Sequence, residues 1–530
     1  MRVLNALLLA ALLLAVSTSA SAGPPDYAFE GTVEPADVGS YLALDFAVPE
    51  GTTKISVEYS YQTAGSGGDF AAGLLSEVID IGLYGPEGFR GWSGSNKKSF
   101  SVALSHEQTT DSYIPGPIPA GTWHVELGVA WVMPGDTMSY AVAVALSTED
   151  VGQTFVPRAP ESPVLSADAR WYKGDLHCHS THSDGAYPMS DVYAYAHSIG
   201  LDYIALTDHN AISQNLYVPD YQDQYPDMLL IPGIEMTSYR GHANVFNYNA
   251  YVDYHGTAPR YDLDGVIDGV HAQGGYFSPN HPKDPVILVG GRPYGLGWGY
   301  PETDWTRVDF FEAINGPSRI GKEIPNPLNG LAIRWWDELQ AQGFALPIRG
   351  GSDDHQAGQG SGATYSPIGT PTTVVYAPEL SATGILDALK AGHAFLMTEG
   401  PDGPEVYLTA TAGDRTAMVG DAIAAGQVQV SARVVRGTGM TLLVLMDGET
   451  LQNFAGLPND DTVASFPLDV TTPARLRAEL YDGLILKAIT NSIFLESAGA
   501  DDDSGDDTGA PPDDDSSSGG NGHHRAGCGG

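Results

Sequence analysis

The amino-acid sequence predicts a multidomain protein of the α/β plus β class, in which a central α/β domain is flanked by N-terminal and C-terminal β-sandwich domains. Three observations support this prediction. The chain has 530 residues, which is long for a single core. Short alternating hydrophobic runs occupy residues 26–150 and return at residues 404–495. Between residues 171 and 400, strand-like runs alternate with helix-like runs.

The first 22 residues are typical of a secretory signal peptide. Arg2 precedes an apolar run at residues 6–16, and the small residues Ala20, Ser21 and Ala22 form a cleavage signal. The apolar run is shorter than the ~20 residues that a membrane-spanning helix needs. We therefore expect export with cleavage after Ala22, and no membrane insertion of the mature chain.

The next segment, residues 26–150, contains alternating runs such as YLALDFAVP, KISVEYSY and WHVELGVAWV, separated by Gly/Pro turns. This pattern predicts a jelly-roll-like β-sandwich. The Pro-rich residues 156–170 are a predicted linker. Two roles stay open for the β domains: they bind a glycan or another cell-surface partner, or they cover the central domain and shape its pocket.

The central segment, residues 171–400, contains strand-like runs such as YIALTDH and TTVVYA and helix-like runs such as MSDVYAYAHSIG. This alternation predicts an α/β barrel or a layered parallel sheet. Residues 404–495 predict a second, smaller β-sandwich. Residues 497–530 are a predicted disordered acidic tail. The tail ends in RAGCGG, which resembles the approach to a cysteine-anchored sorting signal of bacteria, so attachment to the cell surface is one expectation.

The charge of the chain restricts its partners. The formal net charge is −40, which repels phosphate backbones and anionic membranes. We therefore expect no nucleic-acid partner and a small-molecule substrate. Cys178 and Cys528 are the two cysteines of the sequence, and their positions make a structural disulfide improbable.

A histidine-rich motif, DLHCHSTHSDG, occupies residues 175–185. If it continues a strand, His177 and His179 share one face, while Cys178 points to the other and is buried as a small apolar residue. Further ligand-type residues recur at the ends of later predicted strands. They are His209, Glu235, His242, His281, Asp353 and His355.

Strand ends of a parallel barrel converge on one rim, so these scattered residues are expected to meet in space. Imidazoles bind zinc, iron and similar divalent ions, and a carboxylate such as Glu235 can bridge two ions about 3.5–4 Å apart. Such a pair lowers the pKa of a bridging water, which supplies a hydroxide nucleophile near neutral pH. The sequence therefore predicts a site for a pair of divalent ions, for which zinc, manganese and iron are all suitable.

The motifs DLHCHSTHSDG, LTDHN, GIE, NHP and GSDDH resemble those of the PHP (polymerase and histidinol phosphatase) superfamily of metal-dependent hydrolases, over about residues 172–400. The resemblance implies a PHP-type distorted β/α barrel. It also implies two or three metal ions, held by three groups of ligands. The first is His177, His179, Glu235 and Asp353; the second is Glu235, His242 and His281; the third is Asp184, His209 and His355.

The β domain together with GHANVFNYNAYVDY is similar to the CehA/McbA-like branch, whose members cleave carbamate esters and amides. This resemblance implies a catalytic role for Glu235, Asp353 and His209. The FFEAINGP segment adds Glu312 as a catalytic candidate and Asn315 as a substrate contact.

Two alternatives remain open. One is a phosphoesterase that uses the same cluster, for which Lys283 is the nearest candidate cation. The other is a non-catalytic surface binding protein in which the metal cluster is structural.

Overall fold

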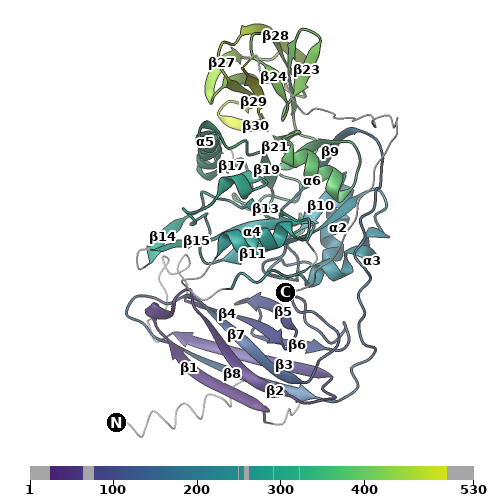
Figure 1. Cartoon of the computed structure of the whole chain (residues 1–530), viewed down its shortest axis with the longest axis vertical. Coiled ribbons are helices and arrows are strands. Elements are labelled where there is room, and N and C mark those ends of the chain that lie inside the picture. Colours follow the sequence, from purple (N-terminus) through teal and green to yellow (C-terminus); the bar gives the residue numbers. More distant parts are fainter. Residues whose placement is uncertain are drawn as a thin grey trace, which may run out of the picture.

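The computed structural model describes residues 24–63, 77–248, 250–255, 262–289, 292–321 and 323–497. The predicted signal peptide and nearly all of the predicted acidic tail lie outside these residues. The α/β region lies between an N-terminal and a C-terminal β region along the long axis of the molecule (Figure 1). Within the described residues, no helix is both long enough and apolar enough to cross a membrane.

The N-terminal region has eight strands: β1 (Tyr27–Val33), β2 (Tyr41–Val48), β3 (Lys54–Thr63), β4 (Val78–Gly85), β5 (Gly88–Gly94), β6 (Ser99–Ala103), β7 (Gly121–Trp131) and β8 (Met138–Ser147). They form two antiparallel sheets, with the orders β1-β8-β3-β6 and β2-β7-β4-β5. These orders are those of an eight-stranded jelly roll. Alternate side chains, such as those of Ile79, Trp123 and Val125, fill one core between the sheets.

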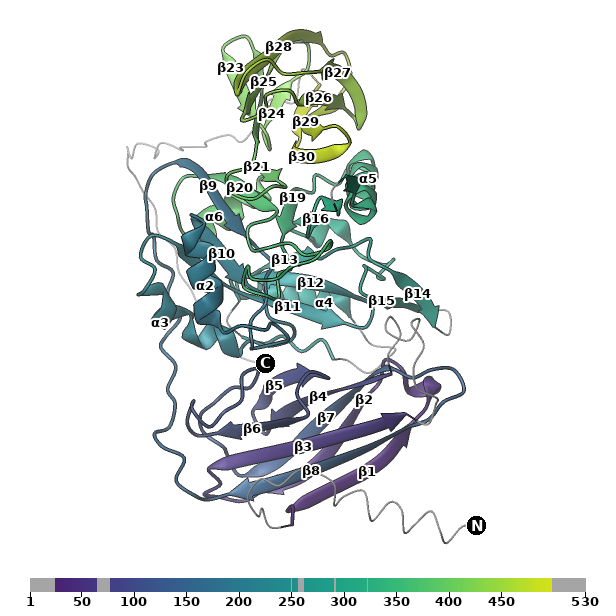
Figure 2. The ribbon, with the colours of Figure 1, turned by 180° about the vertical axis from the view of Figure 1, so that it is seen from behind.

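The linker has an irregular course and runs along the α/β region (Figure 2). Arg158 holds it there, because its guanidinium pairs with Asp220 at 3.2 Å and with Asp223 at 2.6 Å. Both partners lie in or next to the short helix α3 (Val218–Gln222).

The α/β region contains each strand and helix that the alternating runs predict. Its strands are β9 (Arg170–Asp175), β10 (Tyr203–Leu206), β11 (Leu229–Ser238), β12 (Gly241–Phe246), β13 (Tyr276–Pro279), β14 (Val286–Val289), β15 (Arg292–Gly295), β16 (Phe311–Asn315), β17 (Arg319–Ile320), β18 (Ile324–Pro325), β19 (Ile348–Gly351), β20 (Thr372–Ala377) and β21 (Ala394–Met397). Besides α3, its α-helices are α2 (Met189–Ser198), α4 (Leu263–His271), α5 (Pro327–Ala341) and α6 (Ala382–Lys390). Side chains of Asp262, Asn326 and Ser381 cap the last three helices.

The predicted closed barrel is not confirmed. Hydrogen-bonded strands follow the open order β13-β12-β11-β10-β9-β20-β21, and β16 and β19 form a separate parallel pair. This pair lies between β13 on one side and β20 and β21 on the other. Polar side chains cross both gaps in place of a backbone ladder: Arg349 donates to the Ser278 hydroxyl at 2.7 Å, and the Gly350 amide donates to the Thr373 hydroxyl at 3.0 Å.

The C-terminal region has ten strands: β22 (Glu405–Ala412), β23 (Arg415–Met418), β24 (Ala422–Ala424), β25 (Gln427–Val435), β26 (Thr441–Met446), β27 (Glu449–Phe454), β28 (Asp461–Asp469), β29 (Ala474–Asp482), β30 (Ile485–Thr490) and β31 (Ile493–Glu496). One layer has the order β23-β22-β25-β28, and the other contains β30-β29-β26-β27. The expected separate sandwich is instead joined to the α/β region, because β30 pairs with β21. Phe395 and Met397 of β21 therefore share a core with Val406 and Leu476.

Candidate metal centre

The sequence-predicted ligands gather at one end of the α/β strands. His177 and His179 follow β9, His209 follows β10, His281 follows β13, and Asp353 and His355 follow β19. Glu235 lies in β11 beyond the residues that pair with β10. β12 runs antiparallel to β11, so its second residue, His242, returns to the same end, opposite Thr237.

Glu235 is the centre of this arrangement. Its carboxylate is fully buried, and Oε2 lies 3.3 Å from His177 Nε2 and 2.9 Å from His209 Nδ1. The other oxygen, Oε1, lies 3.1 Å from His242 Nδ1 and 3.2 Å from His281 Nε2. A carboxylate with imidazoles around both oxygens has the geometry of a bridge between two cations.

The first ligand group joins His177, His179, Glu235 and Asp353. The four distances between its nitrogens and oxygens are 3.3, 3.3, 3.4 and 3.0 Å. Ligand bonds of about 2.0–2.1 Å around a tetrahedral ion place neighbouring ligand atoms about 3.3–3.4 Å apart. His177 Nε2 and Glu235 Oε2 are buried without a hydrogen-bond partner, which fits a cation between them.

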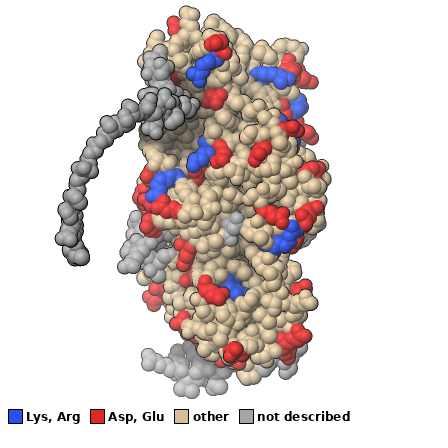
Figure 3. Space-filling view, turned by 45° about the vertical axis from the view of Figure 1, so that its right-hand side comes forward, with Lys and Arg blue, Asp and Glu red and all other residues tan. Residues whose placement is uncertain are grey.

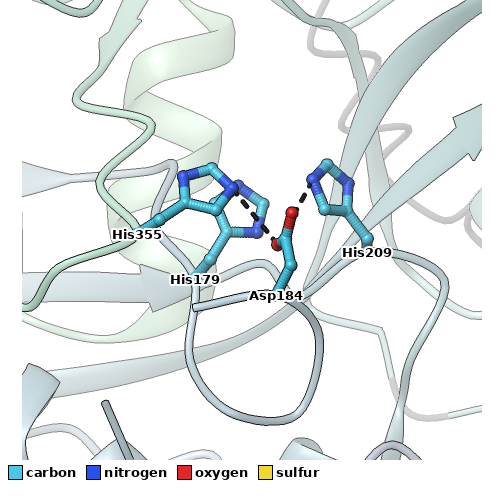
Figure 4. Close-up of side chains that lie close together, drawn as sticks. All are labelled: His179, Asp184, His209 and His355. Atoms are coloured by element: carbon cyan, nitrogen blue, oxygen red, sulfur yellow. Dashed lines mark ion pairs between the residues drawn. The ribbon is translucent and has the colours of Figure 1, made fainter. Parts of the chain in front are cut away.

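Two further groups share residues with the first. His209, Glu235 and His242 form the second. His281 was expected in this group and contacts the same carboxylate. His179, Asp184, His209 and His355 form the third (Figure 4). In the third group, Asp184 Oδ1 lies 3.2 Å from His355 Nε2 and 3.7 Å from His209 Nε2. The structure thus brings all nine predicted ligands together.

Close packing of carboxylates and imidazoles shifts their pKa values. Burial disfavours the charged form of Glu235, but the surrounding imidazoles, first that of His209, hold its pKa well below the usual range. Burial also disfavours protonated His209, yet Glu235 and Asp184 raise its pKa to about 10. Burial lowers the pKa of His179 and of His242 to about 4. Ionised Glu235 and neutral His179 and His242 are the forms that bind divalent ions.

Glu312, a predicted catalytic residue, is fully buried and bonded on both oxygens. Oε1 lies 2.9 Å from His177 Nδ1 and accepts from Arg349 at 2.7 Å. Oε2 accepts from the His281 amide at 2.6 Å and from Asn315 Nδ2 at 3.2 Å. Burial opposes its ionisation, but Arg349 and His177 lower the pKa of Glu312 to about 2. Its contacts are those of a residue that orients ligands, not of one that attacks substrate.

Arg349 is fully buried, and its nitrogens Nη1 and Nη2 bind Glu312 and Asn280. Asn280 in turn donates to Glu235 Oε1 at 2.8 Å. Within the NHP motif, Asn280 thus supplies a side-chain amide that orients Glu235, and His281 supplies a candidate ligand. The role of Asn280 was missed because its partners come from other strands.

Asp175, Asp208 and Asp354 lie beside the candidate ligands in sequence, and their hydrogen bonds among the described residues go to backbone amides and hydroxyls, not to imidazoles. Asp175 accepts from the backbone amides of three residues, the shortest bond being 2.7 Å to Gly369 N. Asp208 accepts from Ser180 and Ser183, and Asp354 accepts mainly from backbone amides, including that of Gly358 at 2.6 Å. They hold the ligand-bearing loops in shape because buried amides need acceptors.

A cavity of about 350 Å³ opens beside Asp353 and His355. Asn315 lines it, and its Nδ2 lies 3.4 Å from Asp353 Oδ2, as expected for a residue at the edge of the cluster. Lys283 also lines it, but its ammonium lies 3.6 Å from the centre of the Trp335 ring. Among the described residues that line this cavity, Lys283 is the single lysine or arginine.

The N-terminal jelly roll contacts the loop that carries Asp184. The Lys97 ammonium donates to the Thr181 carbonyl at 2.9 Å and to the Ser183 carbonyl at 3.2 Å. The Thr181 hydroxyl donates to Asp111 at 2.6 Å. We call these contacts of Lys97 with the loop its brace. The sequence did not predict the brace, because Lys97 lies in no recognisable motif.

Four histidines outside the candidate ligand set, and Cys178, have contacts that are typical of structural residues. His197, His271 and His393 pair with single aspartates, and His182 bonds the Ser213 hydroxyl at 2.7 Å. Cys178 is fully buried and faces Ala205 O, and burial holds the pKa of its thiol well above the usual value. A nucleophilic thiolate is therefore disfavoured.

Comparison with known proteins finds a family that matches part of the chain. Residues 175–285 match the family model of the PHP domain. No curated protein matches the chain. A crystal structure from Bacteroides vulgatus, of a two-domain protein containing a predicted PHP-like metal-dependent phosphoesterase, covers 64% of this chain and 100% of its own, at 20% identity and a TM-score of 0.34. A structure from Bifidobacterium adolescentis, named as a candidate metal-dependent phosphoesterase, covers 37% of this chain and 91% of its own, at 15% identity and a TM-score of 0.26. Residues 175–285 of this chain are therefore similar to the PHP domain.

Proposed function

We propose that the protein is a metal-dependent hydrolase that cleaves a small carboxylic ester, amide or carbamate. The observation that carries this proposal is the buried Glu235 carboxylate, which has imidazoles around both oxygens and an Oε2 without a hydrogen-bond partner. Ionised carboxylates and imidazoles suit zinc, manganese or iron. Two or three such ions, when bound, would lower the pKa of a coordinated water and polarise the substrate carbonyl.

Other residues of the chain orient the candidate ligands and are placed to contact the substrate. Glu312 fixes His177 through Nδ1, which leaves Nε2 directed at Glu235 and Asp353. Asn315 touches Asp353 and lines the cavity, so it is placed to contact substrate. Five of the nine candidate ligands are buried, and water reaches the cluster at the other four. These are Asp184, His355, Asp353 and His209, whose side chains are 33%, 29%, 25% and 21% exposed.

The charges around the cavity favour acyl cleavage over phosphoryl transfer. Transfer of a phosphoryl group usually requires cations that clamp the phosphate in addition to metals. Within the described lining, Lys283 is the single such cation, and its ammonium packs on Trp335. A neutral acyl group at the bond to be cleaved makes no such demand.

The test is turnover by the purified, metal-loaded protein of an aryl N-methylcarbamate and of an aryl phosphodiester, each compared with Asp353→Asn. Metal content of both proteins is measured by mass spectrometry. We expect carbamate turnover that falls at least 100-fold in the variant, together with loss of bound metal. Turnover of the phosphodiester alone would contradict acyl cleavage. Turnover of neither substrate, with metal bound and Asp353→Asn changing only thermal stability, would favour the binding protein.

We also propose that the protein is exported by a bacterium and held at the cell surface through its C-terminal tail. The signal-like residues 1–22 and the terminal RAGCGG support this proposal. Acidic side chains are spread over the face in Figure 3, where the basic ones are fewer, as suits small neutral substrates better than nucleic acid. Cell fractionation with Cys528→Ser tests the attachment, and an unchanged surface fraction would contradict it.

A further inference from the structure

The cavity beside the candidate metal ligands adjoins a second cavity of about 270 Å³. Pro317, Tyr365 and Ser366 line both. The second cavity extends past the start of the β17–β18 hairpin toward Glu399. We call these two adjoining cavities the cleft; Asp353 and His355 line the first cavity, and Arg319 lines the second.

The far end of this cleft carries a local excess of positive charge. Arg319 lines it, and its side chain is 40% exposed. Its guanidinium lies 3.6 Å from Glu399, whose other oxygen lies 2.7 Å from the Lys487 ammonium. Two cations therefore share one carboxylate. This arrangement is notable in a chain whose formal net charge is −40.

The cavity on the metal side also has apolar lining. Pro317, Ile320, Leu328 and Ala332 belong to it. Pro317 lines the second cavity as well, and Ile320 follows Arg319 directly in β17. An apolar part of a substrate can therefore pack between the candidate metal ligands and Arg319.

We propose that Arg319 forms a subsite for a carboxylate at the distal end of the substrate. The inference rests on the proposed function and narrows its substrate class to esters or amides that carry an apolar spacer and a terminal carboxylate. The planar guanidinium can bind a carboxylate through two parallel hydrogen bonds. Glu399 can release its long contact to Arg319 because Lys487 still neutralises it.

The test compares p-nitrophenyl hemiesters of succinate, glutarate and adipate with their methyl esters, which lack the terminal charge. We expect the wild-type protein to prefer at least one hemiester by 10-fold or more in kcat/KM. Arg319→Met should abolish that preference by raising KM, with kcat unchanged, because the contact is remote from the reacting bond. Arg319→Lys should retain part of it.

The matched control is Arg334→Met, which removes an equal charge from an exposed position of α5 outside both cavities. It should keep the preference for the hemiester. Equal kcat/KM for all hemiesters and methyl esters in the wild type, or an equal loss for both in Arg319→Met, would overturn the subsite.

Failure of the proposed function has a different signature, since no ester would then be turned over above the Asp353→Asn background. Titration calorimetry with adipate monoamide tests the subsite in that case without turnover. We expect at least 10-fold weaker binding to Arg319→Met than to Arg334→Met. Equal binding to both variants would overturn the subsite.

Discussion

Glu312 illustrates how one buried residue serves two partners. It holds His177 on one side and neutralises Arg349 on the other, and all three side chains are fully buried. Breaking a buried ion pair from one side costs about 3–5 kcal/mol because the other charge stays unpaired. Loss of an orienting partner lowers metal affinity by about 10–100-fold.

We therefore expect Glu312→Gln to lower both the unfolding temperature and the metal affinity, as measured by thermal unfolding and by competition with a chromophoric chelator. Ser278→Ala separates the two effects, because Ser278 bonds Arg349 but does not contact His177. It should cost about 1 kcal/mol of stability and leave metal affinity unchanged. Equal metal affinity in Glu312→Gln and the wild type would refute the orienting role.

The residue scale is where the sequence was most informative. Histidine and carboxylate types recurred at predicted strand ends, and strand ends of one sheet share one edge. The contact of Arg349 with the ligand-orienting Glu312 was not predicted, because the pair joins two strands 37 residues apart in sequence. The glycine at position 351 is a sequence signal of close packing around His177, since a Cβ there would lie 2.3 Å from His177 Cβ.

At the element scale, the loop between β5 and β6 braces the loop after β9. The Lys97 ammonium donates to the carbonyls of Ser183 and Thr181, which precede Asp184 by one and three residues. Asp184 belongs to the third ligand group and to neither of the others. Loss of the brace should therefore affect one ion more than the rest.

We expect Lys97→Met to lose about one equivalent of bound metal, measured by mass spectrometry after gel filtration, while the ions at Glu235 remain. Lys98→Met is the matched control, because the exposed Lys98 side chain packs over the Tyr61 ring, 3.8 Å from its centre, and should not affect metal. Lys97→Arg should retain part of the metal that Lys97→Met loses. Full stoichiometry in Lys97→Met would show that the loop holds Asp184 without the brace.

At the scale of the whole molecule, the C-terminal region is part of the α/β sheet. Phe395, Leu396 and Met397 of β21 are fully buried, and all three pair with β30. A chain that ends after Thr398 would expose this strand as a free hydrophobic edge, which favours aggregation.

We expect that truncated chain to be insoluble on expression, in contrast to a chain that ends at Ser497 and keeps every described strand. Solubility and size-exclusion chromatography distinguish them. A soluble, monomeric, metal-binding product of the shorter chain would show that the α/β region folds alone.

The half-buried carboxylate of Asp80, at the contact between the jelly roll and the α/β region, makes stability depend on pH. Burial raises the pKa of Asp80 to about 6, although the Tyr239 hydroxyl, 2.9 Å away, lowers it in part. Because the folded pKa exceeds the unfolded value of about 3.9, the folded state binds more protons, and stability falls as pH rises from about 4 to about 6.

We expect Asp80→Asn to be more stable than the wild type above pH ~6, by at most about 3 kcal/mol, and to lose this advantage below pH ~4. Thermal unfolding across that range measures the difference. Parallel pH profiles of the two proteins would mean that Asp80 is not the responsible group.

The sequence by itself determined the order of elements and predicted most of the candidate metal ligands, because both follow from local patterns: alternation of side chains, helix periodicity, and ligand types at strand ends. Asp184 was predicted only through the resemblance to the PHP superfamily. The tertiary structure alone decided which residues orient those ligands, that β30 extends the central sheet, and that Lys97 reaches the loop of Asp184. These contacts join segments far apart in the chain, and only packing of the elements places such segments together.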